Sequence, residues 1–276
     1  MKKHPLLISL FALLIPLASC ANKPVNDPAQ EEWVEFFNGK DLSNWTPKVK
    51  GYALGENPLN TFSVEDGVMK VSYDQYDQFD GRFGHIFYNG GPYSHYRIKV
   101  EYRFVGEQVK GGPAWAFRNN GIMYHAQDPK TMQVDQDFPG CMEYQFLGGN
   151  GVDPRTTGNL CTPATQVVMN GKLSKDHIFN SSSSTYHGDQ WVTAELLVYG
   201  SEKAEHFING QKVIEYTDLQ WDNGSPNGSG FIALQAETHP TQFRRVSFLN
   251  LEGCMDKNAK NFKSYFVKDN KAACQY

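Results

Sequence analysis

The chain has 276 residues, of which 40% are hydrophobic and 20% charged, and its formal net charge at pH 7 is −4. This acidic balance and the lack of any run of Lys and Arg exclude nucleic acid as a partner, because binding to phosphates needs clustered basic side chains. About 240 residues follow position 32, which is enough for one sizeable domain with its own core.

The N-terminus has the pattern of an export signal. Lys2 and Lys3 precede an apolar run over 6–17, which is too short to cross a bilayer. The run ends in Leu-Ala-Ser-Cys, which resembles the box of bacterial lipoproteins in which the cysteine is lipidated and becomes the new N-terminus. The resemblance implies a signal peptide over 1–19, a lipid anchor on Cys20, and a place in the cell envelope, on the periplasmic face or at the cell surface. An ordinary signal peptide cut nearby is the alternative.

Hydrophobic and polar residues alternate along most of the remaining chain, which indicates β-strands with one buried face. The alternation is strict over 96–104. Asp66-Gly67 and Asn209-Gly210 each stand between two alternating runs, as in tight two-residue hairpins. Further strands are expected at 84–88, 115–118, 121–126, 142–147, 191–200, 230–237 and 244–251. Because no apolar helical stripe of ten or more residues occurs, the pattern predicts an all-β sandwich or jelly roll.

Three long loops interrupt the strands, over 106–113, 148–163 and 170–190. Long loops on a β scaffold commonly form the rim of a binding site, although disorder is the alternative for Ser181–Ser184. The glycines of 148–159 lack the Lys-Ser/Thr ending of a phosphate loop, so this segment is interpreted as a flexible loop.

Segments of different composition flank the β region. Residues 20–32 hold Pro, Asn and acidic groups without an apolar pattern, which predicts a flexible tether. The polar tail 253–276 is bounded by cysteines and resembles a short repeat found at the ends of exported bacterial proteins. The sequence thus divides into signal peptide, tether, a main domain over 33–252, and this C-terminal appendage.

Four cysteines remain after Cys20, and an oxidising compartment makes disulfides plausible. Four cysteines allow three connectivities. The preferred pairing is Cys254 with Cys274 and Cys141 with Cys161. A zinc-thiolate site is improbable because the chain has no Cys-x-x-Cys pair.

One stretch, Pro-Gly-Cys-Met-Glu-Tyr-Gln-Phe over 139–146, points to a site. In a strand, Cys141, Glu143 and Gln145 share one face, and the aromatic residues take the other. The face of Glu143 is expected to be wet, and plain surface is the simplest interpretation. The floor of a groove is the alternative, because loops around a curved sheet enclose such a face.

Two further strands have acid–base residues at the same parity. Met123 and His125 share a face of one strand, and Gln235, Glu237 and His239 share a face of another if that strand runs far enough. His titrates near neutral pH and burial raises the pKa of a Glu, so the set suits proton transfer. Surface or hydrogen-bonded structural roles are the alternative for each histidine.

Other residues are candidates for contacts with a ligand. Arg118, Asn119 and Asn120 form a donor cluster where a strand meets a Gly, although a plain turn explains Asn120 equally well. Trp115 and nearby aromatic residues are able to stack on sugar rings, with burial in the core as the commoner outcome.

An ordinary glycosidase needs two carboxylates beside the scissile bond. β-Sandwich glycosidases of the laminarinase type carry Glu-x-Asp-x-x-Glu on one strand, whereas Glu143 is followed at the same parity by Gln145 and Leu147. Glu237 remains the only evident partner, from another strand.

Several segments, taken in order, resemble the 3-keto-disaccharide hydrolase family. They lie between about Glu35 and Leu251, and they read EFFNGKDLSNW, FSVEDGVMKV, RNNGIMYHA, CMEYQF, INGQKVIEY and FIALQAETHPTQFRRVSFLNL. The resemblance implies a concanavalin-like or laminin-G-like jelly roll of two antiparallel sheets. It also implies action on glycosides whose C3 hydroxyl a separate sugar 3-dehydrogenase has oxidised to a ketone. The ketone acidifies the C2 proton, so one base removes it, the C1 group departs by elimination, and water adds back.

The resemblance also suggests roles for the candidate residues. Glu143 is the expected C2 base or a metal ligand, and His125 and His239 are expected in acid–base work or metal binding. The expected substrate contacts are Arg118, Asn120, Gln145, Gln235 and Glu237. A divalent cation held by Glu143 and His125 is a possible cofactor that would stabilise the enolate. The alternative from another class is a lectin-like lipoprotein that binds carbohydrate without catalysis.

Overall fold

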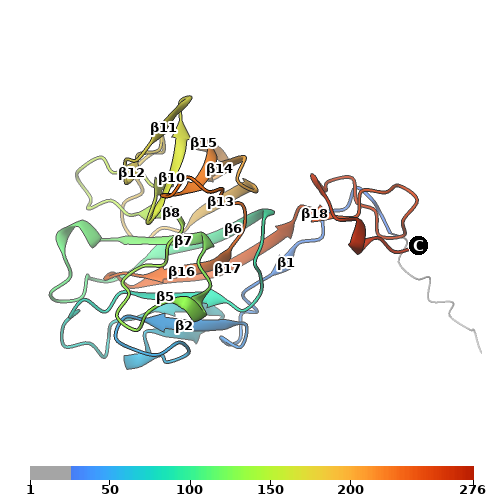
Figure 1. Cartoon of the computed structure of the whole chain (residues 1–276). Coiled ribbons are helices and arrows are strands. Elements are labelled where there is room, and N and C mark those ends of the chain that lie inside the picture. Colours follow the sequence, from blue (N-terminus) through green and yellow to red (C-terminus); the bar gives the residue numbers. More distant parts are fainter. Residues whose placement is uncertain (1–25) are drawn as a thin grey trace, which may run out of the picture.

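The computed structural model describes residues 26–276, and these form an almost purely β structure (Figure 1). The expected signal peptide, Cys20 and the first part of the expected tether lie outside the described residues. Helical turns within the described chain are short 3-10 segments, at Pro58–Asn60, Ala114–Ala116, Pro129–Thr131 and Lys271–Ala273. In this part of the chain no helix has the length and apolar character to span a membrane.

The first sheet has ten strands in the order β11-β10-β15-β14-β13-β6-β17-β4-β3, with β1 also paired to β17. Its pairs are antiparallel. The strands are β1 (Val34–Glu35), β3 (Phe62–Glu65), β4 (Val68–Val71), β6 (His95–Phe104), β10 (Thr165–Met169), β11 (Lys172–Ser174), β13 (Val192–Tyr199), β14 (Lys203–Ile208), β15 (Gln211–Trp221) and β17 (Thr241–Asn250).

The second sheet has seven strands in the order β12-β9-β8-β7-β16-β5-β2, again antiparallel throughout. Its strands are β2 (Trp45–Val49), β5 (Gly84–Tyr88), β7 (Asn119–Ala126), β8 (Met142–Leu147), β9 (Asn159–Cys161), β12 (Ile178–Phe179) and β16 (Phe231–Ala236). The expected all-β sandwich of two antiparallel sheets is confirmed.

The main core lies between the two sheets. Strand β6 alternates buried and half-buried residues along 96–104, as its sequence predicts, and its buried side chains face the second sheet. Tyr102 of β6 stacks on Phe146 of β8 with ring centroids 4.1 Å apart. Burial of such apolar area supplies the main stabilisation, at roughly 25 cal/mol per Å².

Both expected hairpin turns are present. Asp66-Gly67 joins β3 to β4, and Asn209-Gly210 joins β14 to β15. All four residues have positive φ, from 48° to 81°, which the primed two-residue turns require and which Asn, Asp and Gly tolerate best.

The second sheet is buried on both faces, and the sequence did not indicate this. Every residue of β7 is buried, and a small second cluster that includes Met123, Cys141 and Ala233 lies on the face opposite the main core. We call this face, which the segment 127–141 and the long loops of 148–190 cover, the loop-covered face. The expectation that Glu143 lies on a wet face is wrong, since only 5% of its surface is exposed.

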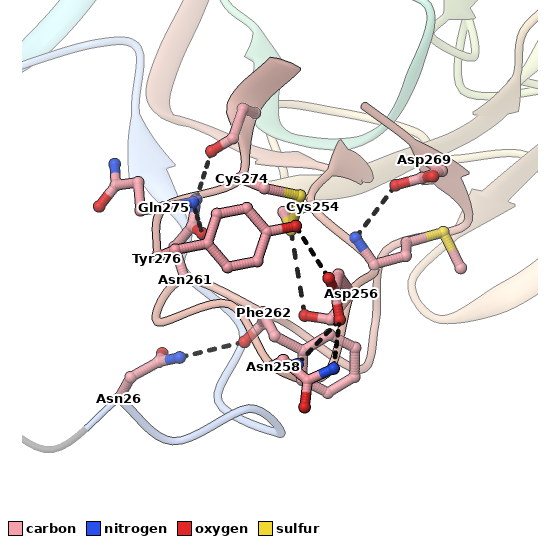
Figure 2. Close-up of a disulfide and its surroundings, with 12 residues drawn as sticks. Asn26, Cys254, Asp256, Asn258, Asn261, Phe262, Asp269, Cys274, Gln275 and Tyr276 are labelled. Atoms are coloured by element: carbon pink, nitrogen blue, oxygen red, sulfur yellow. Dashed lines mark hydrogen bonds between the residues drawn. A yellow bond between two sulfur atoms is a disulfide. The ribbon is translucent and has the colours of Figure 1, made fainter. Parts of the chain in front are cut away.

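The C-terminal appendage forms the predicted Cys254–Cys274 disulfide (Figure 2). It packs against the start of the described chain rather than against the sandwich alone. Asn26 donates to the carbonyl oxygens of Lys260 and Phe262, and the buried Lys263 ammonium lies 2.6 Å from Glu32. The appendage and the N-terminal segment therefore lie side by side in Figure 1. Residues 26–32 are thus held by specific contacts, which a flexible tether would lack.

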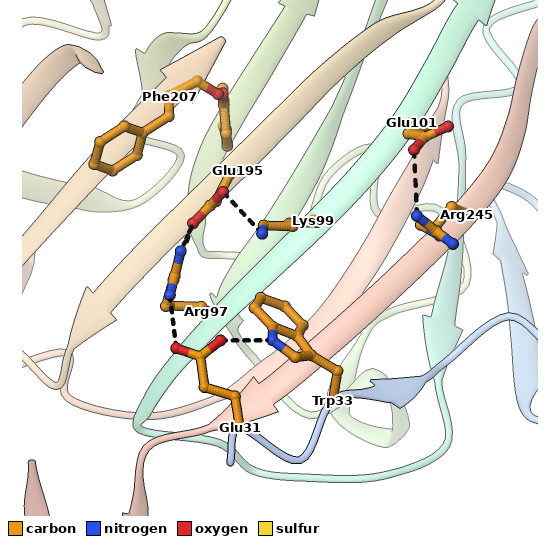
Figure 3. Close-up of polar contacts among 9 residues, drawn as sticks. Glu31, Trp33, Arg97, Lys99, Glu101, Glu195, Phe207 and Arg245 are labelled. Atoms are coloured by element: carbon orange, nitrogen blue, oxygen red, sulfur yellow. Dashed lines mark hydrogen bonds and ion pairs between the residues drawn. The ribbon is translucent and has the colours of Figure 1, made fainter. Parts of the chain in front are cut away.

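The N-terminal segment also lies on the outer face of the first sheet (Figure 3). The Lys99 ammonium lies over the Trp33 ring, 4.5 Å from the ring centroid, and the Trp33 indole N–H donates to the Glu31 carboxylate. Glu31 and Glu195 both pair with Arg97. Such half-exposed ion pairs contribute little individually, about 0–1 kcal/mol, so we assign them a positioning role only.

Candidate functional site

The loop-covered face contains a cavity of about 490 Å³, within the usual size range of small-molecule sites. Its polar lining comes from the second sheet and from two loops, and consists of Asn119, Glu143, Gln145, Arg155, Asn159, His177, Asn180 and Glu237. Its remaining lining consists of Trp115, Phe138, Leu147, Cys161, Pro163 and Ile178.

Glu143 is a buried carboxyl of the cavity lining. It lies on β8, opposite Cys161 of β9 and Met123 of β7. Gly121 of β7 leaves room for its carboxyl group, because a Cβ at this position would lie 3.0 Å from the Glu143 Oε1 atom. Burial disfavours the charged form and raises the pKa of Glu143 to about 8, against a small lowering by a hydrogen bond with Cys161.

Glu237 is the second carboxyl of the cavity. It follows the last residue of β16, is 2% exposed, and its Oε2 atom has no hydrogen-bond partner among residues 26–276. Burial raises its pKa well above the usual range, the Glu143 charge raises it further, and the Arg155 charge opposes both effects. Two buried carboxyls that repel each other do not both ionise readily, so the pair keeps one shared proton over a wide range of pH.

Arg155 supplies the positive charge of the cavity lining, and it was not among the residues expected from the sequence. Its guanidinium donates to the carbonyl oxygens of Trp115, Phe117 and Gly148, which fixes the loop and the arginine together. The segment interpreted as a flexible loop thus supplies a cavity residue. Arg118, the expected arginine, instead pairs with Asp189 at 3.1 Å and does not line the cavity.

Gln145 and Asn159 form a fixed pair of amides beside Glu143. The Asn159 Nδ2 donates to the Gln145 Oε1 at 3.2 Å, and the Asn159 oxygen accepts from the Thr156 hydroxyl and the Ser181 N–H. Because its oxygen is engaged, the Gln145 amide N–H₂ group is oriented as a donor. Ser181, for which disorder was the alternative, is buried in this network.

His125 is not beside Glu143, and the expectation that it shares a face with Met123 is wrong. The pairing of β7 with β16 shifts by one residue between Met123 and Ala126, and His125 has a left-handed φ of 44°. This bulge turns the imidazole toward the main core, where it lies 5.9 Å from the Tyr96 ring and donates through Nδ1 to the Asn227 carbonyl oxygen. Burial lowers its pKa to about 4.

His239 is also placed away from the cavity lining. Strand β16 ends at Ala236, and His239 lies beyond it, packed edge-on against the rings of Phe104 and Phe117. Burial and the nearby Arg118 charge lower its pKa to about 4. Neither ring nitrogen of His239 has a hydrogen-bond partner among residues 26–276, and the imidazole contacts aromatic rings rather than the cavity.

The two expected polar contacts on β7 and β16 also differ from prediction. Asn120 faces the main core and donates to the Gln235 carbonyl oxygen, whereas its neighbour Asn119 lines the cavity. Gln235 lies on the loop-covered face beside His85 of β5 but does not line the cavity. Neither Gln235 amide atom has a hydrogen-bond partner within the described residues.

The expected Cys141–Cys161 disulfide is wrong. Both cysteines are buried, and neither forms a disulfide. Cys161 of β9 lies directly opposite Glu143 of β8. The Cys141 backbone N–H donates to the Pro163 carbonyl oxygen, so the two cysteines are diagonal neighbours, two residues out of register. Diagonal neighbours in a sheet lie about 7–8 Å apart, beyond the usual Cα separation of a disulfide.

The sequence matches, over residues 32–249, the family described as 3-keto-alpha-glucoside-1,2-lyase-like domain. The chain belongs to this family. The match confirms the resemblance noted in the sequence and covers the whole sandwich except Asn250, the last residue of β17.

Solved structures similar to this family member have low sequence identity to it. A Bacillus subtilis protein of unknown function with a galectin-like fold is 13% identical, with a TM-score of 0.49 over 80% of this chain and 97% of that one. The Bacillus licheniformis beta-glucanase is 13% identical, with a TM-score of 0.44 over 80% and 99%. The carbohydrate-binding module CBM66 from Bacillus subtilis is 11% identical, with a TM-score of 0.42 over 76% and 97%. No curated protein sequence matches the chain.

The donor set of this family member does not fit the metal site that the sequence suggested. Glu143 and His125 lie on opposite sides of the second sheet, so they cannot share an ion. Across residues 26–276 no group of three His, Cys, Asp or Glu side chains converges in the manner of a metal site. We derive no catalytic step through a metal.

Gly121→Ala tests the position of the Glu143 carboxyl. The added methyl group would lie 3.0 Å from both the Glu143 Oε1 and the Tyr144 carbonyl oxygen, so the side chain must move. For the activity proposed below, we expect kcat to fall by up to about tenfold, because a shift of a few tenths of an ångström is smaller than the 1 Å displacement that costs about a hundredfold. Gly228→Ala is the control, because a Cβ there meets nothing closer than 3.5 Å. Equal activity of the two variants in steady-state assays would contradict the placement.

Proposed function

We propose that this protein is a lipid-anchored exported enzyme that cleaves 3-keto-glycosides, including 3-keto-disaccharides, by elimination and hydration. The observation that carries the proposal is the pair of buried carboxyls, Glu143 and Glu237, in one cavity of a domain of this family. Their raised pKa values make one a base and the other an acid near neutral pH.

Elimination begins with the Glu143 carboxylate. It removes the C2 proton, which the neighbouring C3 ketone acidifies, and the electron pair forms the enolate. Protonated Glu237 then gives its proton to the C1 oxygen as the C1–O bond breaks and the C1–C2 double bond forms. Arg155 and the Gln145 amide are the charged and neutral donors available to the enolate oxygen.

Hydration reverses these proton transfers. Water adds to C1 while the Glu237 carboxylate accepts its proton, and protonated Glu143 returns a proton to C2. The product is the free 3-keto sugar, and both carboxyls are back in their starting states. A separate sugar 3-dehydrogenase would have to supply the substrate, since this chemistry forms no ketone.

Catalysis is favoured over a purely lectin-like role by the electrostatics of the cavity floor. A site that only binds neutral hydroxyls is served at lower desolvation cost by neutral amides, whereas two buried carboxyls with raised pKa values suit proton transfer. Both carboxyls line the cavity from different strands, as a reaction with a base on one atom and an acid on the next requires.

The decisive experiment follows the C2 proton of a 3-keto-glucoside in D₂O by NMR, with the purified protein. We expect loss of this proton together with release of the C1 group. Intact substrate that shows only binding-induced line broadening would favour the lectin-like alternative. Loss of turnover on addition of EDTA would restore the metal hypothesis.

The pH dependence of turnover gives a second test. Glu143 must be ionised and Glu237 protonated, so kcat/KM should rise as the pH approaches about 8 and fall again at higher pH as Glu237 loses its proton. A profile that is flat between pH 6 and 9 would contradict this assignment.

Anchoring is tested independently of activity. Cys20→Ala should release the protein from membranes into the soluble fraction of the cell envelope. Retention of the variant in the membrane fraction would refute a lipid anchor at this position.

A further inference from the structure

The floor of the cavity is polar and buried, whereas its mouth has two exposed apolar side chains. The polar floor side chains Asn119, Glu143, Gln145, Asn159 and Glu237 are all at most 7% exposed. Trp115 and Ile178, which line the same cavity, are 57% and 52% exposed. Because both side chains line one cavity, they are available to contact an apolar part of a ligand that the buried polar floor does not hold.

Trp115 is held in place before any ligand arrives. One face of its indole stacks on Phe83, with centroids 5.9 Å apart and planes 18° from parallel. Its carbonyl oxygen accepts a hydrogen bond from Arg155. Because packing already holds the Trp115 ring, little side-chain conformational entropy is lost when a ligand contacts its free face. The ring is therefore well suited to bind a flat ligand.

Ile178 adds a second apolar surface at the mouth. It lies on β12, directly paired with Cys161 of β9, so a short strand fixes its position at the edge of the sheet. The polar side chains that line the cavity near it, His177 and Asn180, are both exposed to water.

We propose that the preferred substrates are aryl 3-keto-glycosides, whose flat apolar leaving group lies against Trp115 and Ile178. This inference rests on the proposed function, in which the sugar ring binds at the floor between the carboxyls and its C1 substituent points to the mouth. A sugar as leaving group is able to stack its C–H face on Trp115, but hydroxyls at its edge would then lie against Ile178 without a partner, whereas a flat aryl ring contacts both apolar side chains.

Binding measurements test the inference without interference from turnover. In the Glu143→Gln background, calorimetry compares phenyl 3-keto-glucoside with a 3-keto-disaccharide. We expect the phenyl compound to bind at least tenfold more tightly. When Trp115→Ala is added to this background, the affinity for the phenyl compound should fall about tenfold and that for the disaccharide less than twofold. Trp115→Phe keeps an aromatic ring and should retain most of the affinity for the phenyl compound.

Ile178→Ala should likewise weaken only the phenyl compound, by a few-fold. Its matched control is Leu173→Ala, which removes an equally exposed apolar side chain from β11, outside the cavity lining, and should change neither affinity. Equal losses for both ligands, or none for either, would overturn the aryl preference and leave the proposed function intact. If the wild-type protein neither binds nor cleaves either compound, the proposed function itself fails and the inference with it.

Discussion

Glu143→Gln should lower kcat for 3-keto-glycosides by about a thousandfold, within the range that general bases contribute. The amide keeps the shape of the side chain and its fit over Gly121 but cannot accept the C2 proton. Exchange of this proton with D₂O should therefore stop together with release of the leaving group. Steady-state rates and NMR on the same samples measure both.

A matched control separates this effect from the loss of any buried carboxylate. Glu205 is 8% exposed, close to the 5% of Glu143, but it lies on the outer face of the first sheet and pairs with Lys203 and Lys212. Glu205→Gln should leave kcat unchanged. If Glu143→Gln retains more than a tenth of wild-type activity, Glu143 is not the base.

The same variant should be more stable than the wild type at alkaline pH. The folded protein holds the Glu143 proton up to about pH 8, whereas the unfolded chain releases it near 4.5. Between these values the folded state binds more protons, so the free energy of unfolding falls as pH rises, by up to about 1.4 kcal/mol per unit. Glu143→Gln removes this dependence, and its melting temperature should exceed that of the wild type at pH 8 and vary less between pH 5 and 8.

The sequence predicted those features of the fold that depend on local pattern. Alternation along 96–104 identified a central strand of the first sheet, and the Asp66-Gly67 and Asn209-Gly210 dipeptides identified two hairpins. The parity of 141–146 correctly set Glu143 and Gln145 on one face, because strand geometry alternates without regard to what covers the sheet. Alternation shows which side chains share a face but not whether distant segments pack over that face. The burial of the loop-covered face could therefore not be predicted from it.

The expectation for His125 failed because one extra residue interrupts the alternation of side chains along β7. An extra residue in β7 turned His125 to the main core, and the only local sign is Gly230 on the facing segment, where a Cβ would lie 2.3 Å from the His125 carbonyl carbon. Arg155 was missed because its place depends on three backbone carbonyls from other segments, which no spacing in 148–163 reveals. Glu237, expected as a substrate contact and as a weak partner carboxylate, lines the same cavity as Glu143, because β16 lies two strands from β8 in the second sheet.

The effect of Glu237→Gln should depend on the leaving group. With a poor leaving group such as methoxide, departure from C1 needs the Glu237 proton, and we expect kcat to fall by about 100- to 1,000-fold. With 4-nitrophenolate, which leaves without protonation, the loss should be less than about tenfold. Glu143→Gln, in contrast, should impair both substrates alike, since proton removal at C2 precedes departure in both.

Comparison of the two variants on the two 3-keto-glucosides therefore assigns the roles. A Glu237→Gln variant that is equally impaired on both substrates would not be missing a leaving-group acid, and Glu237 would then be a candidate for the base. The pH profile of this variant gives independent support. The fall in kcat/KM above pH 8 should disappear, because the group that loses its proton there is gone, while the rise controlled by Glu143 should remain but move to lower pH. The direction of that move follows from electrostatics, since removing a neighbouring carboxyl removes the repulsion that opposes ionisation of Glu143.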